Sequence, residues 1–383
     1  MSVFETPTGR GVPRGMAKLL AINWSLIVLL AAVACAGFLM LYSVADGSLE
    51  PWAQAQMIRF AVGVAGMIVI GMVDIRFWRL MAPFAYAVSL LLLVAVDVMG
   101  VIGMGAQRWI DLGPIQLQPS EMMKIALVMA LAAYYHWLPP KKVSRLFWVI
   151  LPLLLIMMPV ALVMEQPDLG TAILLLAGGG AVMFLAGVSL WYFGAAVASV
   201  AGLVTLILES QGKPWQLLED YQFRRIFTFL DPGADPLGAG YHITQAMIAM
   251  GSGGLTGRGY MEGTQVRLNF LPEKHTDFIF TALAEEFGYI GTTTVLVLYA
   301  LIVVFCVASA ISNRDRFGAL LTGGIAMSFF LLFAVNMGMV MGLMPVVGVP
   351  LPLVSYGGTA MIVLLSAFGL VQSAHVHRPR SQD

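Results

Sequence analysis

Charged side chains are scarce in this 383-residue chain: Asp, Glu, Lys and Arg together make up 11% of it, whereas a soluble domain carries roughly 25%. The 21 basic and 21 acidic residues cancel, so no overall positive field favours nucleic acid as a partner. Cysteine is nearly absent, and Cys35 and Cys306 both lie in apolar runs, which argues against a disulfide or cysteine–metal framework. Because 59% of the residues are hydrophobic, lipid is the expected solvent for most of the chain.

Apolar runs of the length that a transmembrane helix needs, about 20 residues, recur along the whole chain. Seven come before a long polar segment and three come after it, and the fourth and sixth runs are short. The predicted spans are Trp24–Tyr42, Met57–Val73, Leu80–Val98, Met122–Trp137, Leu146–Val163, Thr171–Gly187, Trp191–Leu208, Phe287–Ala310, Phe317–Val340 and Thr359–Val376. The sequence thus predicts an all-α integral membrane protein with about ten transmembrane helices, in which residues 1–383 form a single polytopic domain.

Basic residues are distributed unevenly between the predicted loops. If the N-terminus is cytoplasmic, the short outer loops hold only Arg108, with Arg59 near an outer helix end. The inner segments then hold Arg10, Arg14, Lys18, Arg76, Arg79, Lys141, Lys142, Arg145, Arg314, Arg316, Arg378 and Arg380. Lys and Arg concentrate in cytoplasmic loops, so both termini are expected in the cytoplasm. Residues 209–276 then form one large structured extracytoplasmic loop between the seventh and eighth spans, in which His242–Met250 is predicted to form a short amphipathic helix.

The start of the fourth span, Gln118–Lys124, contains two charged residues. Ionisable groups within spans are costly and are therefore candidates for a functional role. Glu121 and Lys124 are three residues apart, so they share one helix face and can neutralise each other. Two interpretations stay open: a structural ion pair that holds helices together, or a Lys124 that faces an outer cavity and attracts an anion such as a pyrophosphate.

A second polar stretch, Leu271–Phe280, leads into the eighth span. Thr276 is the expected N-cap, and Asp277 is expected in the first helical turn, at the outer membrane boundary. There the helix dipole would lower the pKa of Asp277 and keep its carboxylate ionised. Such a carboxylate can accept a proton from a hydroxyl or hold a divalent cation, and an ordinary capping acid is the alternative.

Four further features have a structural interpretation that competes with a functional one. Glu285 and Glu286 are adjacent and cannot both face one partner, so at least one is expected to pair structurally. Asp168, at the start of the sixth span, is expected to cap that helix rather than to bind a ligand. The glycine-rich stretch 251–259 lacks the Gly-Lys-Ser/Thr ending of a P-loop. Residues 345–358 contain three prolines and cannot form a regular helix, which favours a re-entrant cavity wall over an ordinary surface loop.

Six short motifs occur in order along the chain, at residues 105–113, 118–124, 166–171, 251–254, 272–277 and 351–358. Together they resemble the shape, elongation, division and sporulation (SEDS) family of membrane proteins. The resemblance covers nearly the whole chain, from the first span to the last. Within that family the chain is more similar to the elongation polymerases than to the division ones, on the stretches 262–265 and 284–286 and on its short tails.

The resemblance implies a peptidoglycan glycosyltransferase in the bacterial cytoplasmic (inner) membrane. Such an enzyme would polymerise lipid II, a disaccharide-peptide on undecaprenyl pyrophosphate, into β-1,4 glycan strands, with inversion at the anomeric carbon. Asp277 falls on the family's essential aspartate, so it is the expected general base or else the ligand of a Mg or Mn ion. The residues expected to bind substrate are Arg108, Glu121, Lys124, His275 and Ser355. The implied partners are a class B penicillin-binding protein, the nascent glycan strand and membrane lipid.

Two other classes of function compete with this one. A flippase for lipid-linked precursors would need polar groups in both halves of the membrane, whereas the acids and Lys124 within the predicted spans cluster toward the outer half. A non-catalytic scaffold for cell-wall proteins would not need a charged site at a membrane-edge cavity. The flippase is the main alternative to the polymerase.

Overall fold

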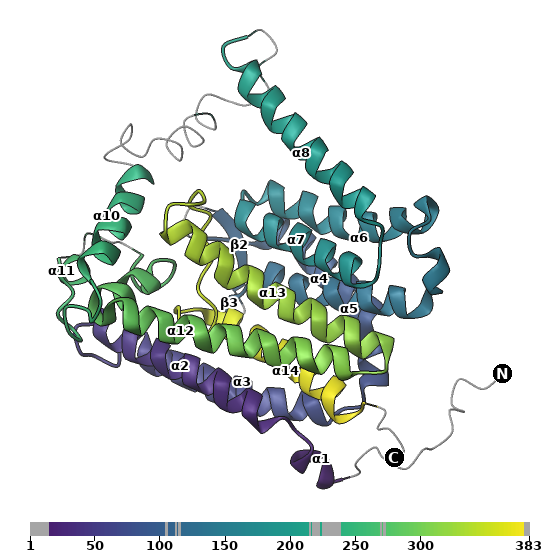
Figure 1. The fold of residues 1–383 in the computed structure, drawn as a ribbon, viewed down its shortest axis with the longest axis horizontal. Coiled ribbons are helices and arrows are strands. Elements are labelled where there is room, and N and C mark those ends of the chain that lie inside the picture. The colour runs from purple at the N-terminus through teal and green to yellow at the C-terminus, as the bar shows by residue number, and fades with distance from the viewer. Residues whose placement is uncertain are drawn as a thin grey trace.

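The structure of the protein is a computed structural model, and it describes residues 15–103, 106–111, 113, 116–213, 216, 223, 239–268, 270 and 273–378. Ten long helices occupy the positions of the ten predicted spans, which confirms the all-α membrane architecture (Figure 1). They are α2 (Trp24–Val44), α3 (Ala53–Met72), α4 (Ile75–Met99), α5 (Pro119–Trp137), α6 (Leu146–Glu165), α7 (Leu169–Leu185), α8 (Leu190–Ser210), α12 (Ile279–Ser312), α13 (Arg316–Val340) and α14 (Gly358–Val376).

Most of these helices have the composition that lipid demands. In the described part of the chain, eight are long and apolar enough to cross a membrane. The two outside that group are α7, which has only 17 residues, and α5, which carries Glu121 and Lys124. These are the fourth and sixth spans, whose apolar runs are short in the sequence as well.

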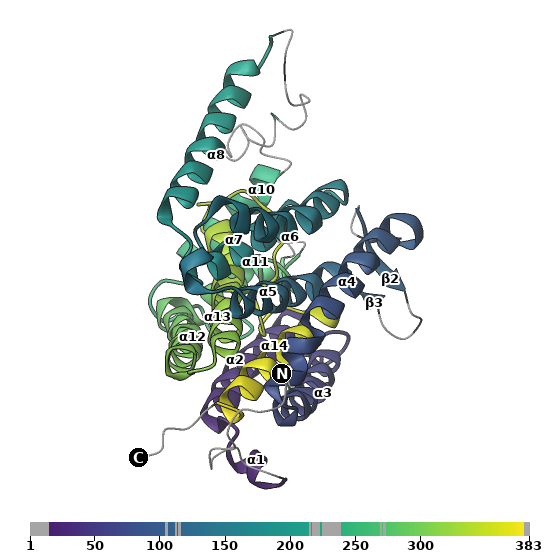
Figure 2. The same cartoon turned by 90° about the vertical axis from the view of Figure 1, so that its right-hand side faces the viewer.

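The helices pack in pairs, several of them distant in sequence. α14 lies along α3, α12 along α13 and α4 along α5 (Figures 1 and 2). Small residues allow the backbones of α3 and α14 to approach, since a Cβ on Gly63 would come within 2.4 Å of the Leu365 side chain. α8 stands apart from this bundle, and of its 21 residues only Ser210 is buried. Its apolar surface is therefore left to lipid.

One end of the bundle brings the beginning of α2 and the end of α14 together. The Asn23 N–H donates to Gln372 Oε1 (2.9 Å), and the Gln372 amide donates in return to the Asn23 carbonyl (3.0 Å). The Ser373 hydroxyl donates to the carbonyl of Val73, which follows α3 (2.7 Å). Because α2 begins and α14 ends at the same end of the bundle, the number of crossings between them is even, as the sequence predicted.

α12 is broken at Gly288, whose φ of 62° and ψ of −157° are not helical. The glycine-rich stretch 251–259 fills the break. Four backbone hydrogen bonds of 2.9–3.1 Å join the two segments: Arg258 N to Glu285 O, Gly259 N to Glu286 O, Tyr289 N to Gly254 O and Ile290 N to Leu255 O. Backbone groups that the broken helix leaves open are thus bonded within the protein, as a position at membrane depth requires. We call residues 251–259 the plug of α12. Their close backbone contacts with α12 explain the glycines, and no phosphate ligand is needed to explain them.

Several short elements complete the fold. Between α8 and α12, α10 (Ala239–Ser252) occupies the place of the predicted helix His242–Met250, and α11 (Thr264–Arg267) follows it. Other parts of the predicted 209–276 loop lie outside the described residues, so its extracytoplasmic placement stays a prediction. A small antiparallel sheet between α4 and α5 was not predicted, because strands this short leave no periodic pattern. Its strands are β1 (Val101–Gly103), β2 (Ala106–Asp111) and β3 (Gln116–Leu117), and the remaining elements are α1 (Ala17–Leu20) and the 3-10 turn η1 (Pro140–Lys142).

The close fit of the plug predicts that Gly253 tolerates no side chain. A Cβ on Gly253 would lie 2.0 Å from the carbonyl oxygen of Ala284, a backbone atom that cannot move without disturbing α12. Gly253→Ala is expected to destabilise the protein by about 1–3 kcal/mol, the usual result of overpacking, and to lower the melting temperature in detergent. Gly251→Ala is the matched control, because nothing lies within 4 Å of its added Cβ. Equal melting temperatures for the two variants would contradict the plug.

Candidate functional site

The turn that precedes α12, residues 273–278, contains Asp277. The N–H groups of Thr276 and Phe278 donate to the Glu273 carbonyl (3.2 and 3.3 Å), and the Thr276 hydroxyl donates to Glu273 Oε2 (3.0 Å). Thr276 is therefore not the N-cap that the sequence predicted, because its hydroxyl is used within the turn. The N-cap is Phe278, with no side-chain hydrogen bond, and Asp277 lies just before the helix rather than in its first turn.

Three successive carbonyls of this turn are held by donors from distant parts of the chain. The three hydrogen bonds run from Tyr356 N to His275 O (2.9 Å), from Ser355 Oγ to Thr276 O (2.6 Å) and from Asn336 Nδ2 to Asp277 O (2.9 Å). Two donors belong to the non-helical segment 341–357, and the third belongs to α13. The backbone position of Asp277 is consequently set by tertiary contacts and not by the helix that follows it.

The Asp277 carboxylate is partly buried and surrounded by other acids. A Cβ on Gly348 would lie 3.5 Å from Asp277 Oδ2, so the carboxylate faces the 341–357 segment. Burial, with the nearby carboxylates of Glu273 and Asp168, raises the pKa of Asp277 to about 6. The prediction that the helix dipole would lower this pKa is wrong, because desolvation and like charges outweigh the dipole.

Arg108 and Asp168 meet next to this turn. Arg108 extends from β2, places Nη1 3.8 Å from Asp168 Oδ2, and donates through Nε to the Gln166 carbonyl (3.2 Å) and through Nη2 to the Pro167 carbonyl (2.5 Å). Asp168 also accepts from the N–H and the hydroxyl of Thr171 (3.1 and 2.9 Å), which makes it the N-cap of α7. Asp168 is therefore both the predicted cap and the partner of Arg108, and its carboxylate is one of the charges that raise the pKa of Asp277.

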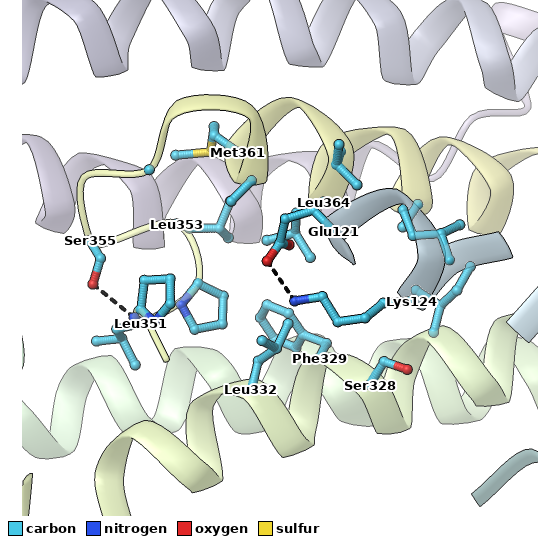
Figure 3. Close-up of a pocket in the computed structure, with 18 of the residues that line it drawn as sticks. Glu121, Lys124, Ser328, Phe329, Leu332, Leu351, Leu353, Ser355, Met361 and Leu364 are labelled. Atoms are coloured by element: carbon cyan, nitrogen blue, oxygen red, sulfur yellow. Dashed lines mark hydrogen bonds and ion pairs between the residues drawn. The ribbon is translucent and has the colours of Figure 1, made fainter. Parts of the chain in front are cut away.

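A mostly apolar cavity lies against segment 341–357. Its walls come from α3, α5, α13, α14 and residues 350–357, and Glu121, Lys124 and Ser355 are among the lining residues (Figure 3). Lys124 Nζ lies 2.8 Å from Glu121 Oε1, and the two side chains are 11% and 12% exposed. The predicted ion pair forms and Lys124 also faces a cavity, whereas its attraction for an anion stays a prediction.

Ser355 links this cavity to the Asp277 turn, and His275 is part of the turn. The Ser355 hydroxyl, besides donating to Thr276, accepts from the Leu351 N–H (2.8 Å) and is only 3% exposed, so it has its partners within the protein. The His275 ring stacks on Trp52 with centroids 4.4 Å apart. Burial lowers the pKa of His275, which keeps the imidazole neutral at pH 7. In the structure both residues position the turn, and their contact with substrate stays a prediction.

Glu285 and Glu286 are buried and take separate partners. Glu285 Oε1 accepts from the Thr264 hydroxyl and the Gln265 N–H (3.0 Å each), which attaches α11 to α12. Glu286 accepts a short hydrogen bond from the Ser43 hydroxyl of α2. Both acids therefore connect elements, as the structural interpretation expected.

The residues around Asp277 supply only part of the ligands that a divalent cation needs. Among the described residues, no group of three or more His, Cys, Asp or Glu side chains is arranged to hold a metal ion. Asp277 and Glu273 have carboxylate oxygens of the kind that Mg or Mn prefers as ligands. These two residues alone do not fill the coordination shell of such an ion. Pyrophosphate oxygens of a substrate would have to complete it.

With this geometry in view, comparison with known proteins gives the family. The family model described as a cell cycle protein, which covers FtsW, RodA and SpoVE, matches residues 17–380. This chain belongs to the FtsW/RodA/SpoVE family. The peptidoglycan glycosyltransferase MrdB of Escherichia coli K12 is 46% identical over 322 residues, 84% of each chain. A probable peptidoglycan glycosyltransferase FtsW of Trichlorobacter lovleyi is 36% identical over 367 residues, 91% of this chain and 92% of that one.

Solved structures of the family share the fold. A chain from a peptidoglycan synthase complex, in a study of the structural coordination of polymerization and crosslinking, gives a TM-score of 0.80 at 32% identity, covering 93% of this chain and 98% of that chain. The crystal structure of the rod shape determining protein RodA from Thermus thermophilus gives 0.70 at 30% identity, covering 94% and 99%. The SEDS resemblance inferred from the six motifs is thereby confirmed, and the higher identity to MrdB than to this FtsW agrees with the predicted elongation type.

Asn336 was not among the residues predicted for the site. It is fully buried in α13 and donates both to Asp277 O and to Val349 O (2.9 and 2.7 Å). The available signal was an amide side chain inside an otherwise apolar span, since polar groups in spans are costly and need a reason. Only the tertiary structure shows that its partners lie in the Asp277 turn and in segment 341–357.

The Glu121–Lys124 pair predicts a specific pattern of stability. Lys124→Met leaves a largely buried carboxylate without its partner, and is expected to destabilise the protein by about 3–5 kcal/mol. Adding Glu121→Gln removes the orphaned charge and should recover a large part of that loss. Melting temperatures of the single and double variants in detergent measure both effects. If the double variant melts no higher than Lys124→Met, the pair does not hold the bundle together.

Proposed function

We propose that this chain is a peptidoglycan glycosyltransferase that polymerises lipid II into β-1,4 glycan strands during cell elongation. The observation that carries the proposal is Asp277, a carboxylate with a pKa raised to about 6 on a turn held at three carbonyls, next to an apolar cavity that contains an ion pair. The relative at 46% identity is a peptidoglycan glycosyltransferase. Titratable groups with perturbed pKa values beside a cavity are typical of catalytic sites.

The proposed reaction is a single displacement at the anomeric carbon of the donor. The 4-hydroxyl oxygen of an acceptor GlcNAc forms the new glycosidic bond while the bond to undecaprenyl pyrophosphate breaks, so the configuration inverts. Asp277 takes the proton of the attacking hydroxyl. A carboxyl group with a pKa near 6 is mostly ionised at neutral pH and is a stronger base than an ordinary aspartate. General base catalysis of this kind contributes a factor of about 10²–10⁴ to the rate.

One of two basic side chains, Arg108 or Lys124, is proposed to stabilise the leaving pyrophosphate. Arg108 is paired with Asp168 and Lys124 with Glu121, so each cation is already held in place when the substrate arrives. Preorganised cations in a site of low dielectric stabilise developing negative charge without reorganisation. A Mg or Mn ion, if bound, would be held by Asp277 and Glu273 and would neutralise part of the pyrophosphate charge.

The Asp277 end of the bundle is proposed to face the extracytoplasmic side of a bacterial inner membrane. The opposite end carries basic residues predicted to be cytoplasmic: the Lys18 ammonium donates to the Met72 carbonyl at the end of α3 (2.8 Å), and Arg316 donates to the Leu138 carbonyl after α5 (2.7 Å). Lys and Arg concentrate on the cytoplasmic side, so both termini belong there. This orientation puts the polymerase site on the side where the cell wall is built.

A class B penicillin-binding protein is the proposed partner. The solved relative with a TM-score of 0.80 comes from a peptidoglycan synthase complex that coordinates polymerization and crosslinking. A transpeptidase on the extracytoplasmic side would receive glycan strands made at Asp277. Lipid II, the nascent strand and surrounding membrane lipid complete the set of partners.

A flippase is less well supported by the position of the polar groups. Gln56, Glu121 and Lys124 line the cavity from the first two turns of α3 and α5, and these turns lie at the Asp277 end of the bundle. A carrier that moves a pyrophosphate across the bilayer would need polar groups along the whole path. The observed arrangement favours chemistry at one face of the membrane.

The role of Asp277 predicts the result of a minimal substitution. Asp277→Asn keeps the shape of the side chain but cannot accept the hydroxyl proton, so lipid II polymerisation by the purified protein with its partner should fall by at least about 10²-fold. Insertion into the membrane should be unchanged, and the melting temperature should not fall, because the substitution removes a charge that burial and like charges destabilise. Glu262→Gln, an exposed acid-to-amide change in the outer segment, is the control and should polymerise like the parent. Near-parental polymerisation by Asp277→Asn would show that Asp277 is not the base.

The raised pKa of Asp277 predicts the pH dependence of the reaction. The base acts in its ionised form, so kcat/KM should fall as the pH decreases through about 6. Glu273 raises this pKa through its negative charge, so Glu273→Gln should move the acid limb to lower pH while keeping an acceptor for the Thr276 hydroxyl. Rates measured between pH 5 and 8 for the parent and for Glu273→Gln test the shift. If the acid limb does not move in Glu273→Gln, the charge of Glu273 does not influence the pKa of Asp277.

A further inference from the structure

Asn336 makes an unusual set of contacts for a residue in a membrane-spanning helix. Its side chain is 0% exposed within α13. One amide hydrogen is donated to the Asp277 carbonyl (2.9 Å) and the other to the Val349 carbonyl (2.7 Å). Its own Oδ1 atom is buried with no hydrogen-bond partner among the described residues. The Asn336 side chain therefore donates two hydrogen bonds and accepts none from the described residues.

These two donors join three separate parts of the site. α13 is a regular helix of the bundle, Asp277 belongs to the turn before α12, and Val349 belongs to the non-helical segment 341–357. A buried amide with an unsatisfied oxygen is costly in an apolar interior, so packing alone does not account for an asparagine here. The hydrogen-bond geometry of Asn336 explains why an asparagine is present, because the two N–H groups of one planar amide hold the carbonyls of Asp277 and Val349 at a fixed separation.

We propose that Asn336 is a positioning residue for the reaction, which fixes the Asp277 backbone relative to α13 and to segment 341–357 and so aims the carboxylate at the acceptor hydroxyl. The proposal rests on the function proposed above for Asp277. Asn336 is not among the residues that line the cavity, so it acts through Asp277 and not by touching substrate. Ser355 donates to the neighbouring carbonyl but also lines the cavity, so a Ser355 variant would change both the turn and the cavity. Asn336 does not line the cavity, so its variants test the turn alone.

A loosened turn should affect the chemical step more than substrate binding. Misplacement of a catalytic group by about 1 Å can reduce a rate by 10²-fold, whereas residues that bind the substrate are untouched. Asn336→Leu has a similar shape and no donors. It is expected to lower kcat for lipid II polymerisation by about 10²-fold with little change in KM.

A double-variant comparison separates positioning from a general loss of structure. A purely structural role would reduce the amount of active enzyme whichever residue stands at position 277, so Asn336→Leu would lower the residual kcat of Asp277→Asn as much as it lowers the kcat of the parent. A positioning role acts through the Asp277 carboxylate, so the two losses should not add.

The experiment uses the full-length chain with its partner, and Thr322→Val is the matched control. Thr322 is also fully buried in α13, its hydroxyl has no hydrogen-bond partner among the described residues, and valine has nearly the same shape. The control should keep the parental kcat and KM. Parental kinetics for Asn336→Leu, or a loss of kcat that Thr322→Val shares, would overturn the proposal.

Two further variants keep the outcome decisive. If Asn336→Leu does not fold, Asn336→Ala, which also removes both donors, decides by the same division between kcat and KM. Asn336→Leu added to Asp277→Asn should cause no further loss of kcat, because the base that it positions is gone. Full activity of Asp277→Asn alone would refute the proposed function. Inactive Asp277→Asn with fully active Asn336 variants would refute only the role of Asn336.

Discussion

Inside a bilayer no water is present to hydrogen-bond a backbone N–H or carbonyl, so each of these groups needs a partner within the protein. Regular helices meet this requirement by themselves. Among the described residues, Gly288 of α12 and segment 341–357 depart from helical geometry within the bundle. The glycine-rich stretch 251–259 supplies the partners at the first place, and side chains such as Asn336 and Gln56 supply them at the second.

The same requirement builds the site. Segment 341–357 is bonded to the turn that carries Asp277, so satisfying one irregular stretch of backbone also fixes the other. A turn held in this way keeps its carboxylate in one place, and rigid support of this kind is what a catalytic group needs. The burial that comes with it raises the pKa of Asp277 to about 6. Stability and reactivity therefore arise from one set of contacts.

Several charges in and around the bundle have a partner among the described residues. Lys124 is neutralised by Glu121, Arg108 is paired with Asp168, and hydrogen bonds from Thr264, Gln265 and Ser43 stabilise the two acids of α12. Asp277 lies near the like charges of Glu273 and Asp168, and burial together with these charges raises its pKa. Such an arrangement is costly to the fold and is typical of a site kept for its chemistry.

Amino-acid order alone determined the properties that depend on neighbouring residues. The ten spans follow from the local length of apolar runs, the non-helical stretch from the prolines of residues 345–358, and the family from six motifs in order. Tertiary structure decided the rest: the pKa of Asp277, the use of the glycines as a plug, and the contribution of Asn336. Desolvation and through-space contacts join segments that are far apart in the chain, and no local pattern reports which segments will meet.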